Sequence, residues 1–140
     1  MVAVDRKFEF EVVSPERLLL SEAVDMAVIP GAEGDFGVLA GHTLMISTLR
    51  PGVIEVWQGE QVVNRLFIGG GFAEVTETRC TVLADSAVPV AEIDATAAQA
   101  EVEALRAEQQ AAGSEGEKNA LSVKLAVAEA KVAASGKALH

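Results

Sequence analysis

The first ninety residues contain short apolar or alternating runs separated by turn-forming residues. In residues 7–13, Phe8, Phe10 and Val12 alternate with Glu9 and Glu11, as in a strand with one buried face. Similar runs recur about every eight to twelve residues, a spacing typical of a β-sandwich or barrel. We therefore predict an N-terminal β-sandwich of about eight to ten short strands over residues 1–90. The other runs cover residues 18–22, 24–29, 44–49, 53–58, 61–68, 72–77 and 80–87.

Proline and glycine residues mark the expected turns between these strands. Residues 14–16, Ser-Pro-Glu, interrupt the first run, and residues 59–60, Gly-Glu, reverse a later one. Residues 50–52, Arg-Pro-Gly, have proline and glycine in the order of a type II turn. Residues 69–71 are three consecutive glycines, which predict a bulge or a sharp bend.

In residues 29–42, IPGAEGDFGVLAGH, three of the glycines, Gly31, Gly34 and Gly37, lie at three-residue spacing between two apolar runs. Glycine adopts positive φ angles without steric cost, so this stretch predicts a tight, shaped loop. Glu33 and Asp35 lie between the glycines, and His42 ends the stretch. We expect the loop to hold Asp35 and His42 out from the rigid strands that flank it.

The composition changes after residue 93. Residues 95–112 contain neither glycine nor proline and are rich in Ala, Glu and Gln, which are strong helix formers. Asp94 is the expected N-cap, and Ser114 with Glu117 has the spacing of a capping box for a second helix ending near Ser135. The short connection predicts an antiparallel helix hairpin, in a C-terminal domain of residues 91–140. The expected apolar stripes are Ala98, Val102, Leu105 and Ala112, and Leu121, Leu125, Ala128 and Val132.

The charges of the two helices favour their pairing. Residues 94–112 carry four acids and one base, whereas residues 117–137 carry two acids and four lysines. Both stripes are rich in Ala and Val, so each helix buries little area. The hairpin is therefore either weakly docked and able to detach or a permanently packed cap, and the pattern alone leaves both open.

The chemical inventory argues against several functions. The formal net charge of −10 makes nucleic-acid binding improbable. The single cysteine, Cys80, excludes an internal disulfide, and its apolar neighbours indicate a buried thiol. No serine or cysteine triad, phosphate-binding loop or metal-ligand cluster is recognisable in the sequence. We expect no catalytic residue, no cofactor and no metal.

The sequence gives no sign of membrane insertion. The N-terminal residues lack the apolar segment of a secretory signal. The longest charge-free run, residues 38–49, is shorter than the ~18–20 residues that a membrane helix needs. We expect a cytoplasmic chain that can still attach to a membrane complex.

A few polar residues stand out, and each has two interpretations. Glu33 and Asp35 are either solvated acids or a carboxylate pair. His42 is either a hydrogen-bonded histidine at a strand end or a contact residue at a protein interface. Lys124 and Lys131 are seven residues apart and share one helix face. That face is either merely solvated or a basic stripe that meets an acidic partner.

Taken in order, several motifs resemble the epsilon subunit of the bacterial F-type ATP synthase, and the resemblance covers nearly the whole chain. The central motif is highly specific, whereas the helical tail alone would not be. The motifs are Val12–Glu16 (VVSPE), residues 29–56 (IPGAEGDFGVLAGHTLMISTLRPGVIEV), Gly70–Val75 (GGFAEV), Thr81–Ala87 (TVLADSA) and Glu92–Asp94 (EID).

The resemblance implies a non-catalytic rotor subunit in the central stalk, peripheral to the cytoplasmic face of the inner membrane. It implies contacts with the gamma subunit and the ring of c subunits, and a hairpin that in many members extends along gamma and inhibits ATP hydrolysis. By position, Glu33 and Asp35 would face the c ring, and Ser14 and His42 would lie at or near gamma. Lys124 and Lys131 would lie in the region that transiently meets the beta subunits in inhibitory members.

One departure from the family pattern concerns ATP. Members that bind ATP carry Ile-Asp-x-x-Arg-Ala at the start of the first helix, but Ala97 stands at the arginine position here. Alanine cannot make a charge-assisted bond to phosphate, so we expect weak or no ATP binding. Arg106 is the only arginine of the tail, which also argues against strong inhibition by the hairpin.

Two other functions remain possible from the residues alone. The chain could be a stand-alone β-sandwich binding module with an accessory helix pair. It could also be a small hydrolase that uses Asp35 and His42, although no second catalytic partner is evident. The ordered set of motifs favours the rotor subunit.

Overall fold

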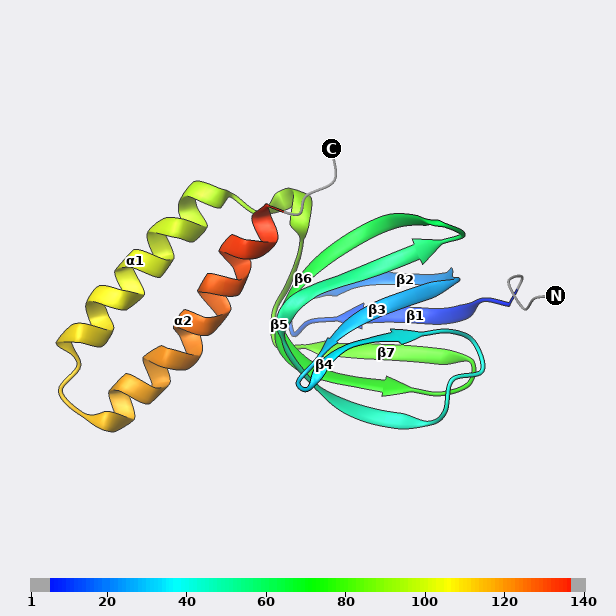
Figure 1. Ribbon diagram of the computed structural model, residues 1–140, viewed down its shortest axis with the longest axis horizontal. Helices are drawn as coiled ribbons and strands as arrows, with labels where there is room; N and C mark the ends of the chain where they lie inside the picture. Colours follow the sequence, from blue (N-terminus) through cyan, green and yellow to red (C-terminus); the bar gives the residue numbers. More distant parts are fainter. Residues whose placement is uncertain (1–5, 137–140) are drawn as a thin grey trace.

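The computed structural model describes residues 6–136 and has two parts, a β-sandwich and a pair of helices beside it (Figure 1). This confirms the α+β architecture predicted from the sequence. The elements in chain order are β1 (Phe8–Val13), β2 (Leu18–Val24), β3 (Met26–Gly31), β4 (Gly34–Val38), β5 (Met45–Gln58), β6 (Gln61–Val75), β7 (Arg79–Ala84), β8 (Ala87–Pro89), the 3₁₀-helix η2 (Val90–Glu92), α1 (Ala95–Ala111) and α2 (Glu115–Ser135).

All eight strands belong to one hydrogen-bonded sheet that folds over on itself. The strand order is β2-β1-β7-β6-β5-β3-β4, and β8 pairs separately with β6. β1 and β7 are parallel, and the other pairs are antiparallel. β5 and β6, of 14 and 15 residues, curve through both layers of the sandwich (Figure 1). They therefore join the two layers.

The turn predicted at residues 50–52 is wrong, because β5 runs through it without reversing. Pro51 lies opposite Gly69 of β6, and Gly52 does not have a positive φ. Its lack of a side chain serves close packing instead, since a Cβ atom there would lie 2.9 Å from Cβ of Pro30. The side-chain alternation changes at this point: Leu49 faces the core before it, and Ile54 and Val56 face the core after it.

The three glycines at residues 69–71 also lie inside a strand, directly opposite this part of β5. The pairing continues through them without a shift of register, so they form a bend and not a bulge. Gly70 and Gly71 have φ angles of 105° and 142°, which side chains rarely tolerate. A Cβ atom at Gly71 would lie 2.2 Å from the carbonyl oxygen of Leu83 in β7.

The core between the two layers is built from aliphatic and phenylalanine side chains. Cys80 is fully buried there, as predicted, and desolvation raises the pKa of its thiol to about 12. The thiol therefore stays protonated and unreactive. Other fully buried members are Phe10, Val12, Val24, Ile29, Ile54, Val56, Ile68 and Val82.

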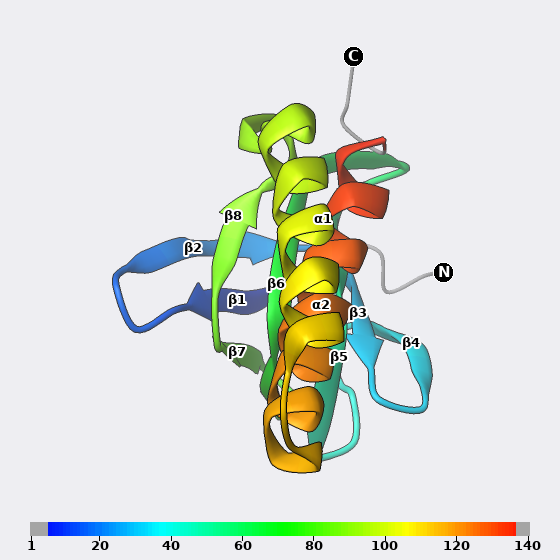
Figure 2. The ribbon, with the colours of Figure 1, turned by 90° about the vertical axis from the view of Figure 1, so that its left-hand side faces the viewer.

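The helix hairpin matches its predicted bounds closely. The side chain of Asp94 accepts a hydrogen bond from the amide of Ala97, and that of Ser114 accepts one from the amide of Glu117, so both predicted caps are confirmed. α2 lies between α1 and the sheet (Figures 1 and 2). It packs on the outer face of β5 and β6 through a second apolar cluster that includes Phe67, Val90 and Ala134.

The contacts between the helices differ in detail from the expected stripes. Ala98 and Val102 of α1 and Ala128 of α2 are buried, whereas Leu121, Leu125 and Val132 are only half-buried. Arg106 of α1 pairs with Glu129 of α2 at 2.6 Å. The basic partner of this ion pair lies on the net acidic helix and the acidic partner on the net basic one, so the net charges did not predict the pair.

We expect Gly71→Ala to destabilise the sandwich by roughly 2 kcal/mol or more, because the new methyl group meets the β7 backbone at a strained φ. Urea unfolding followed by circular dichroism measures the change. Gly113→Ala, in the open connection between the helices, is the matched control and should change stability by less than about 0.5 kcal/mol. Equal effects of the two substitutions would contradict this role of Gly71.

Candidate functional site

The glycine-rich stretch forms a β-hairpin over most of its length, so its prediction as a loop was largely wrong. β3 and β4 pair from Ala27 opposite Val38 to Gly31 opposite Gly34. Ala32 and Glu33 form the two-residue turn, and Gly34 has a φ of 137°. Neither turn residue has a positive φ; the unusual angle falls on the residue directly after the turn, where a side chain is rarely tolerated. Glu33 is thereby exposed at the hairpin tip.

Asp35, two residues further on, is held by Arg50 of β5. One guanidinium nitrogen of Arg50 lies 2.5 Å from Oδ1 of Asp35, and the other donates to the carbonyl oxygen of Gly31 at 2.6 Å. Arg50 therefore binds both strands of the hairpin. Sequence reasoning missed this residue because it was assigned to a turn.

Ser14 lies in the connection between β1 and β2 and is 6% exposed. Its hydroxyl group contacts Oε2 of Glu16 at 3.2 Å and the carbonyl oxygen of Arg17 at 3.3 Å. These local bonds shape the turn that the Ser-Pro-Glu sequence predicted. Most of the Ser14 side chain is thus not available at the surface of the isolated chain.

His42 lies in the connection between β4 and β5 and is half-buried. Its Nδ1 atom lies 2.7 Å from the carbonyl oxygen of Thr43. The amide of the neighbouring Gly41 donates to the backbone carbonyl oxygen of Glu77 in the β6–β7 turn. This end of the sheet is opposite to the end that carries Ser14. The structure therefore does not bring Ser14 and His42 together.

His42 is also separated from Asp35. Asp35 is near the first residue of β4, whereas His42 follows the last residue of that strand. A hydrolytic site built from Asp35 and His42 would need the two side chains in hydrogen-bond reach. Their positions at opposite ends of β4 do not support this alternative.

Lys124 and Lys131 lie on α2, at exposed and half-buried positions respectively. Within residues 6–136 neither lysine forms an ion pair. Lys131 lines a small cavity of about 270 Å³ at the start of α1, together with three acids, Glu92, Asp94 and Glu101. The two lysines thus share a helix but have different surroundings.

An exposed apolar row crosses the outer face of the sheet, and sequence reasoning missed it. Leu18 of β2 lies opposite Val13 of β1, Val13 opposite Leu83 of β7, and Leu83 opposite Phe72 of β6. Leu18, Leu83 and Phe72 are 56%, 55% and 55% exposed. Exposed apolar side chains that adjoin one another mark interaction surfaces far better than single ones. We call these four residues the apolar row.

The hairpin tip lies near one end of β5, where a shallow cavity of about 590 Å³ extends from Glu33 and Asp35 to Ile46 and Thr48. Thr48 lies opposite Phe72 in the β5–β6 ladder. The apolar row and the acidic hairpin therefore adjoin through β5, and together they form one candidate interaction surface.

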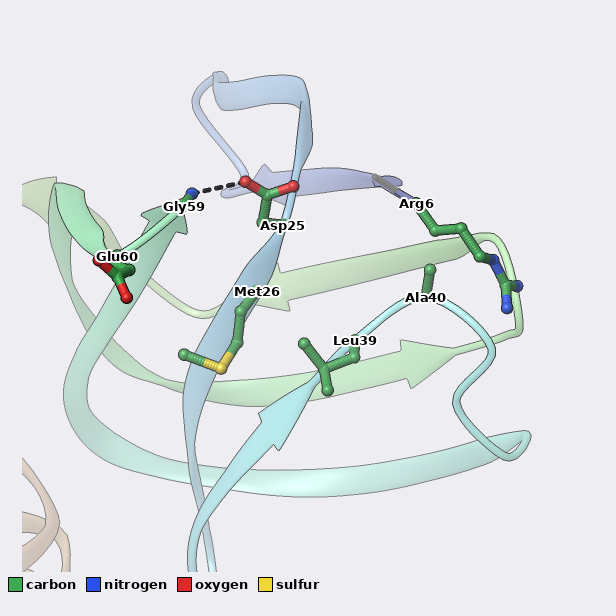
Figure 3. A pocket seen from close by; sticks show the side chains of 7 residues that line it. All are labelled: Arg6, Asp25, Met26, Leu39, Ala40, Gly59 and Glu60. Carbon is green, nitrogen blue, oxygen red and sulfur yellow. Dashed lines mark hydrogen bonds between the residues drawn. The ribbon is translucent and has the colours of Figure 1, made fainter. Parts of the chain in front are cut away.

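A mostly apolar pocket of about 550 Å³ opens at the other end of the sandwich (Figure 3). Asp25 on its rim accepts a hydrogen bond from the amide of Gly59 at 2.5 Å and pairs with Lys7 at 3.1 Å. These two interactions, the Gly59 bond above all, lower the pKa of Asp25 below its ordinary value of 3.8. Asp25 is thus a structural anion. The pocket is lined by Arg6, Asp25, Met26, Leu39, Ala40, Gly59 and Glu60.

The part of the chain that the structure describes shows neither a metal-binding cluster nor a helix able to span a membrane. No group of three or more His, Cys, Asp or Glu residues there is arranged to hold a metal ion. No helix between residues 6 and 136 is long and apolar enough to cross a membrane.

Comparison with known proteins identifies the family of this chain. Residues 7–90 match the family model described as ATP synthase, Delta/Epsilon chain, beta-sandwich domain. The chain belongs to the ATP synthase epsilon chain family. It is 51% identical over 126 residues to the epsilon chain of Rhodospirillum rubrum, covering 90% of this chain and 94% of that one. The epsilon chain of Paramagnetospirillum magneticum is 50% identical over 128 residues, with 91% and 96% covered.

Solved structures agree with this assignment. A chain of the Euglena gracilis mitochondrial ATP synthase, in a structure of OSCP, F1 and the c ring, superposes with a TM-score of 0.80 at 29% identity and covers 95% of this chain and 84% of its own. A chain of the Tetrahymena thermophila central stalk and c ring superposes with a TM-score of 0.64 at 14% identity, covering 93% and 97%. The second likeness shows the fold alone. Members of the epsilon chain family are non-catalytic subunits of the ATP synthase.

The Gly59 hydrogen bond and the Lys7 ion pair of Asp25 predict a pH-dependent stability. Because the pKa of Asp25 is lowered in the folded chain, its contribution is present above the ordinary value and is lost as the pH falls through the lowered value. Asp25→Asn should therefore lower the free energy of unfolding at about pH 7, and the difference should shrink as the pH falls below the ordinary value. Urea unfolding over this pH range tests this. Glu60→Gln, on the same rim, is the control and should have no effect at neutral pH.

The cavity at the start of α1 predicts no micromolar affinity for ATP. Its charged lining consists of three acids and one lysine, which repels a polyphosphate, and Ala97 replaces the arginine of the family motif. Isothermal titration of the full chain with ATP is the measurement. Ala97→Arg should raise the affinity detectably, whereas Ala100→Arg, outside the cavity, should not. Micromolar binding by the native chain would disprove this prediction.

Proposed function

We propose that this chain is a non-catalytic rotor subunit in the central stalk of a proton-translocating F-type ATP synthase, which couples the catalytic head to the c ring through gamma. Family membership over residues 7–90 and the similarity to a chain of the Euglena F1 and c-ring assembly support this proposal. The function needs a rigid body with two contact surfaces, and no chemistry of its own.

The apolar row is the observation that carries the proposal. Large side chains rarely stay exposed beside one another on a chain that works alone. The row lies on a sheet whose backbone is fixed by pairing on both sides of β1, β7 and β6. A partner docked there would therefore be held by a stiff surface, which suits the transmission of torque.

We propose the specific contacts from the positions of these residues in the family motifs. The hairpin with Glu33 and Asp35 would face the c ring, where acidic groups fix orientation against basic loops more than they add affinity. Gamma would contact the sandwich near Ser14 and near His42. Because these residues lie at opposite ends of the sheet, a contact that includes both must extend along the length of the sandwich. Ser14 itself is buried, so it would act through the shape of its turn.

The helix hairpin would supply the regulatory part. We propose that residues 1–90 and 91–140 act as separate domains, and that Lys124 and Lys131 meet the beta subunits transiently. The docking of α2 by small side chains such as Ala134 supports a hairpin that can detach, because little apolar area holds it. The subunit would be peripheral to the cytoplasmic face of the inner membrane, attached only through the complex.

The alternative is a stand-alone β-sandwich binding module, since an exposed apolar row would serve any protein partner. Tagged chain isolated from its host distinguishes the two functions. Recovery of gamma, alpha and beta subunits supports the rotor subunit, and their absence favours the separate module.

Substitution of the apolar row tests the proposal directly. Phe72→Gln and Leu83→Gln should each weaken binding to isolated gamma by about 2 kcal/mol, because truncated apolar anchors dominate interface energies. Surface plasmon resonance with immobilised gamma measures the loss. Val123→Gln, at a 67% exposed valine on α2, is the matched control and should bind as the native chain does. Unchanged binding by both row variants would place the gamma contact elsewhere.

A further inference from the structure

We infer that Arg50 is a positioning residue that clamps the β3–β4 hairpin, and that Glu33 alone supplies the free negative charge with which the hairpin meets a basic partner. This inference rests on the proposed function, because it divides the roles of the two acids within the proposed c-ring contact. Asp35 becomes part of the support, and Glu33 becomes the contact residue.

The guanidinium group of Arg50 bridges the two strands of the hairpin. Arg50 donates from separate nitrogens to the Gly31 carbonyl oxygen on β3, at 2.6 Å, and to Oδ1 of Asp35 on β4, at 2.5 Å. The two acceptors flank the two-residue turn on either strand. A planar fork that binds both strands fixes the angle between the tip and β5, which a single-point ammonium group does not.

The tip of the hairpin has little other support from the sheet. β4 is the last strand of the sheet and pairs only with β3, so its outer edge is unpaired. The β3–β5 ladder is also irregular here, since the register shifts between Val28 and Gly31. The amide of Ala32 still donates to the carbonyl oxygen of Thr48 at 2.9 Å. The Arg50 bonds and this amide bond together attach the tip to β5.

The two acids of the hairpin differ in how their charge is compensated. The carboxylate of Asp35 is paired with Arg50, so from a distance the two groups largely cancel. Glu33 is exposed at the turn and forms no ion pair with any residue between 6 and 136. A basic partner group therefore meets the charge of Glu33, at a position that the Asp35–Arg50 pair sets.

The clamp also lies beside the helix hairpin. Asp35 and Arg50 line a groove of about 250 Å³ whose other wall includes Ala130, Ala133 and Ala134 of α2. The tip is thus placed relative to the docked helix as well as to the sheet.

Hydrogen exchange in the free full-length chain tests the clamp. Arg50→Gln should speed exchange of the Ala32 amide about tenfold, and Arg50→Lys should not restore protection, because one ammonium group does not bridge both strands. Arg79→Gln, which removes the exposed pair of Arg79 with Glu11, is the matched control and should leave Ala32 unchanged. Native protection of Ala32 in both Arg50 variants would overturn the clamp.

Binding to a reconstituted gamma–c-ring complex at several salt concentrations tests the division of charge. Glu33→Gln should weaken binding roughly threefold at low salt and reduce its salt dependence. Asp35→Asn should leave the salt dependence at its native value, and Glu60→Gln is the control acid on another turn. A loss of salt dependence in Asp35→Asn equal to that in Glu33→Gln would overturn the inference. If the native chain fails to bind the complex, the proposed function fails, while the exchange experiment still decides the clamp.

Discussion

The core can be enclosed only because β5, β6 and β7 approach one another closely at the glycines of β5 and β6. Two strands of 14 and 15 residues pass together from one layer to the other, and Pro51 lies opposite Gly69 where they bend. Side chains at Gly52 or Gly71 would meet neighbouring backbone or ring atoms. Because the bend is shared by paired strands, a single folded sheet encloses the core.

The same bend distributes apolar side chains between the core and two outer surfaces. On β6, Phe67 points outward and is covered by α2, whereas Phe72, beyond the glycines, also points outward but stays exposed. This strand thus contributes both to the seat of the helix hairpin, which it shares with β5, and to the apolar row. Docking of the hairpin and docking of a partner use different parts of one rigid element, so either can change while the sandwich keeps its shape.

Ion pairs and hydrogen bonds then orient the turns and helices that apolar packing does not fix. Arg50 fixes the acidic hairpin, Lys7 and the Gly59 amide fix Asp25, and Arg106 joins the two helices. Each of these pairs is at least partly exposed, so each contributes little stability. Their value lies in the placement of turns and helices relative to the sheet, which a subunit with contacts but no chemistry requires.

The sandwich, the helix pair and both helix caps were predictable from the sequence, because alternation and capping are local and their signals lie within a few residues. The acidic tip was predictable as well. The tertiary structure was needed to show that residues 50–52 continue a strand, that Arg50 holds Asp35, and that Ser14 and His42 lie at opposite ends of the sheet. It alone assembled the apolar row from four strands. These features depend on which strands become neighbours and on which face of each strand is covered, and no local pattern specifies either when both faces carry apolar residues.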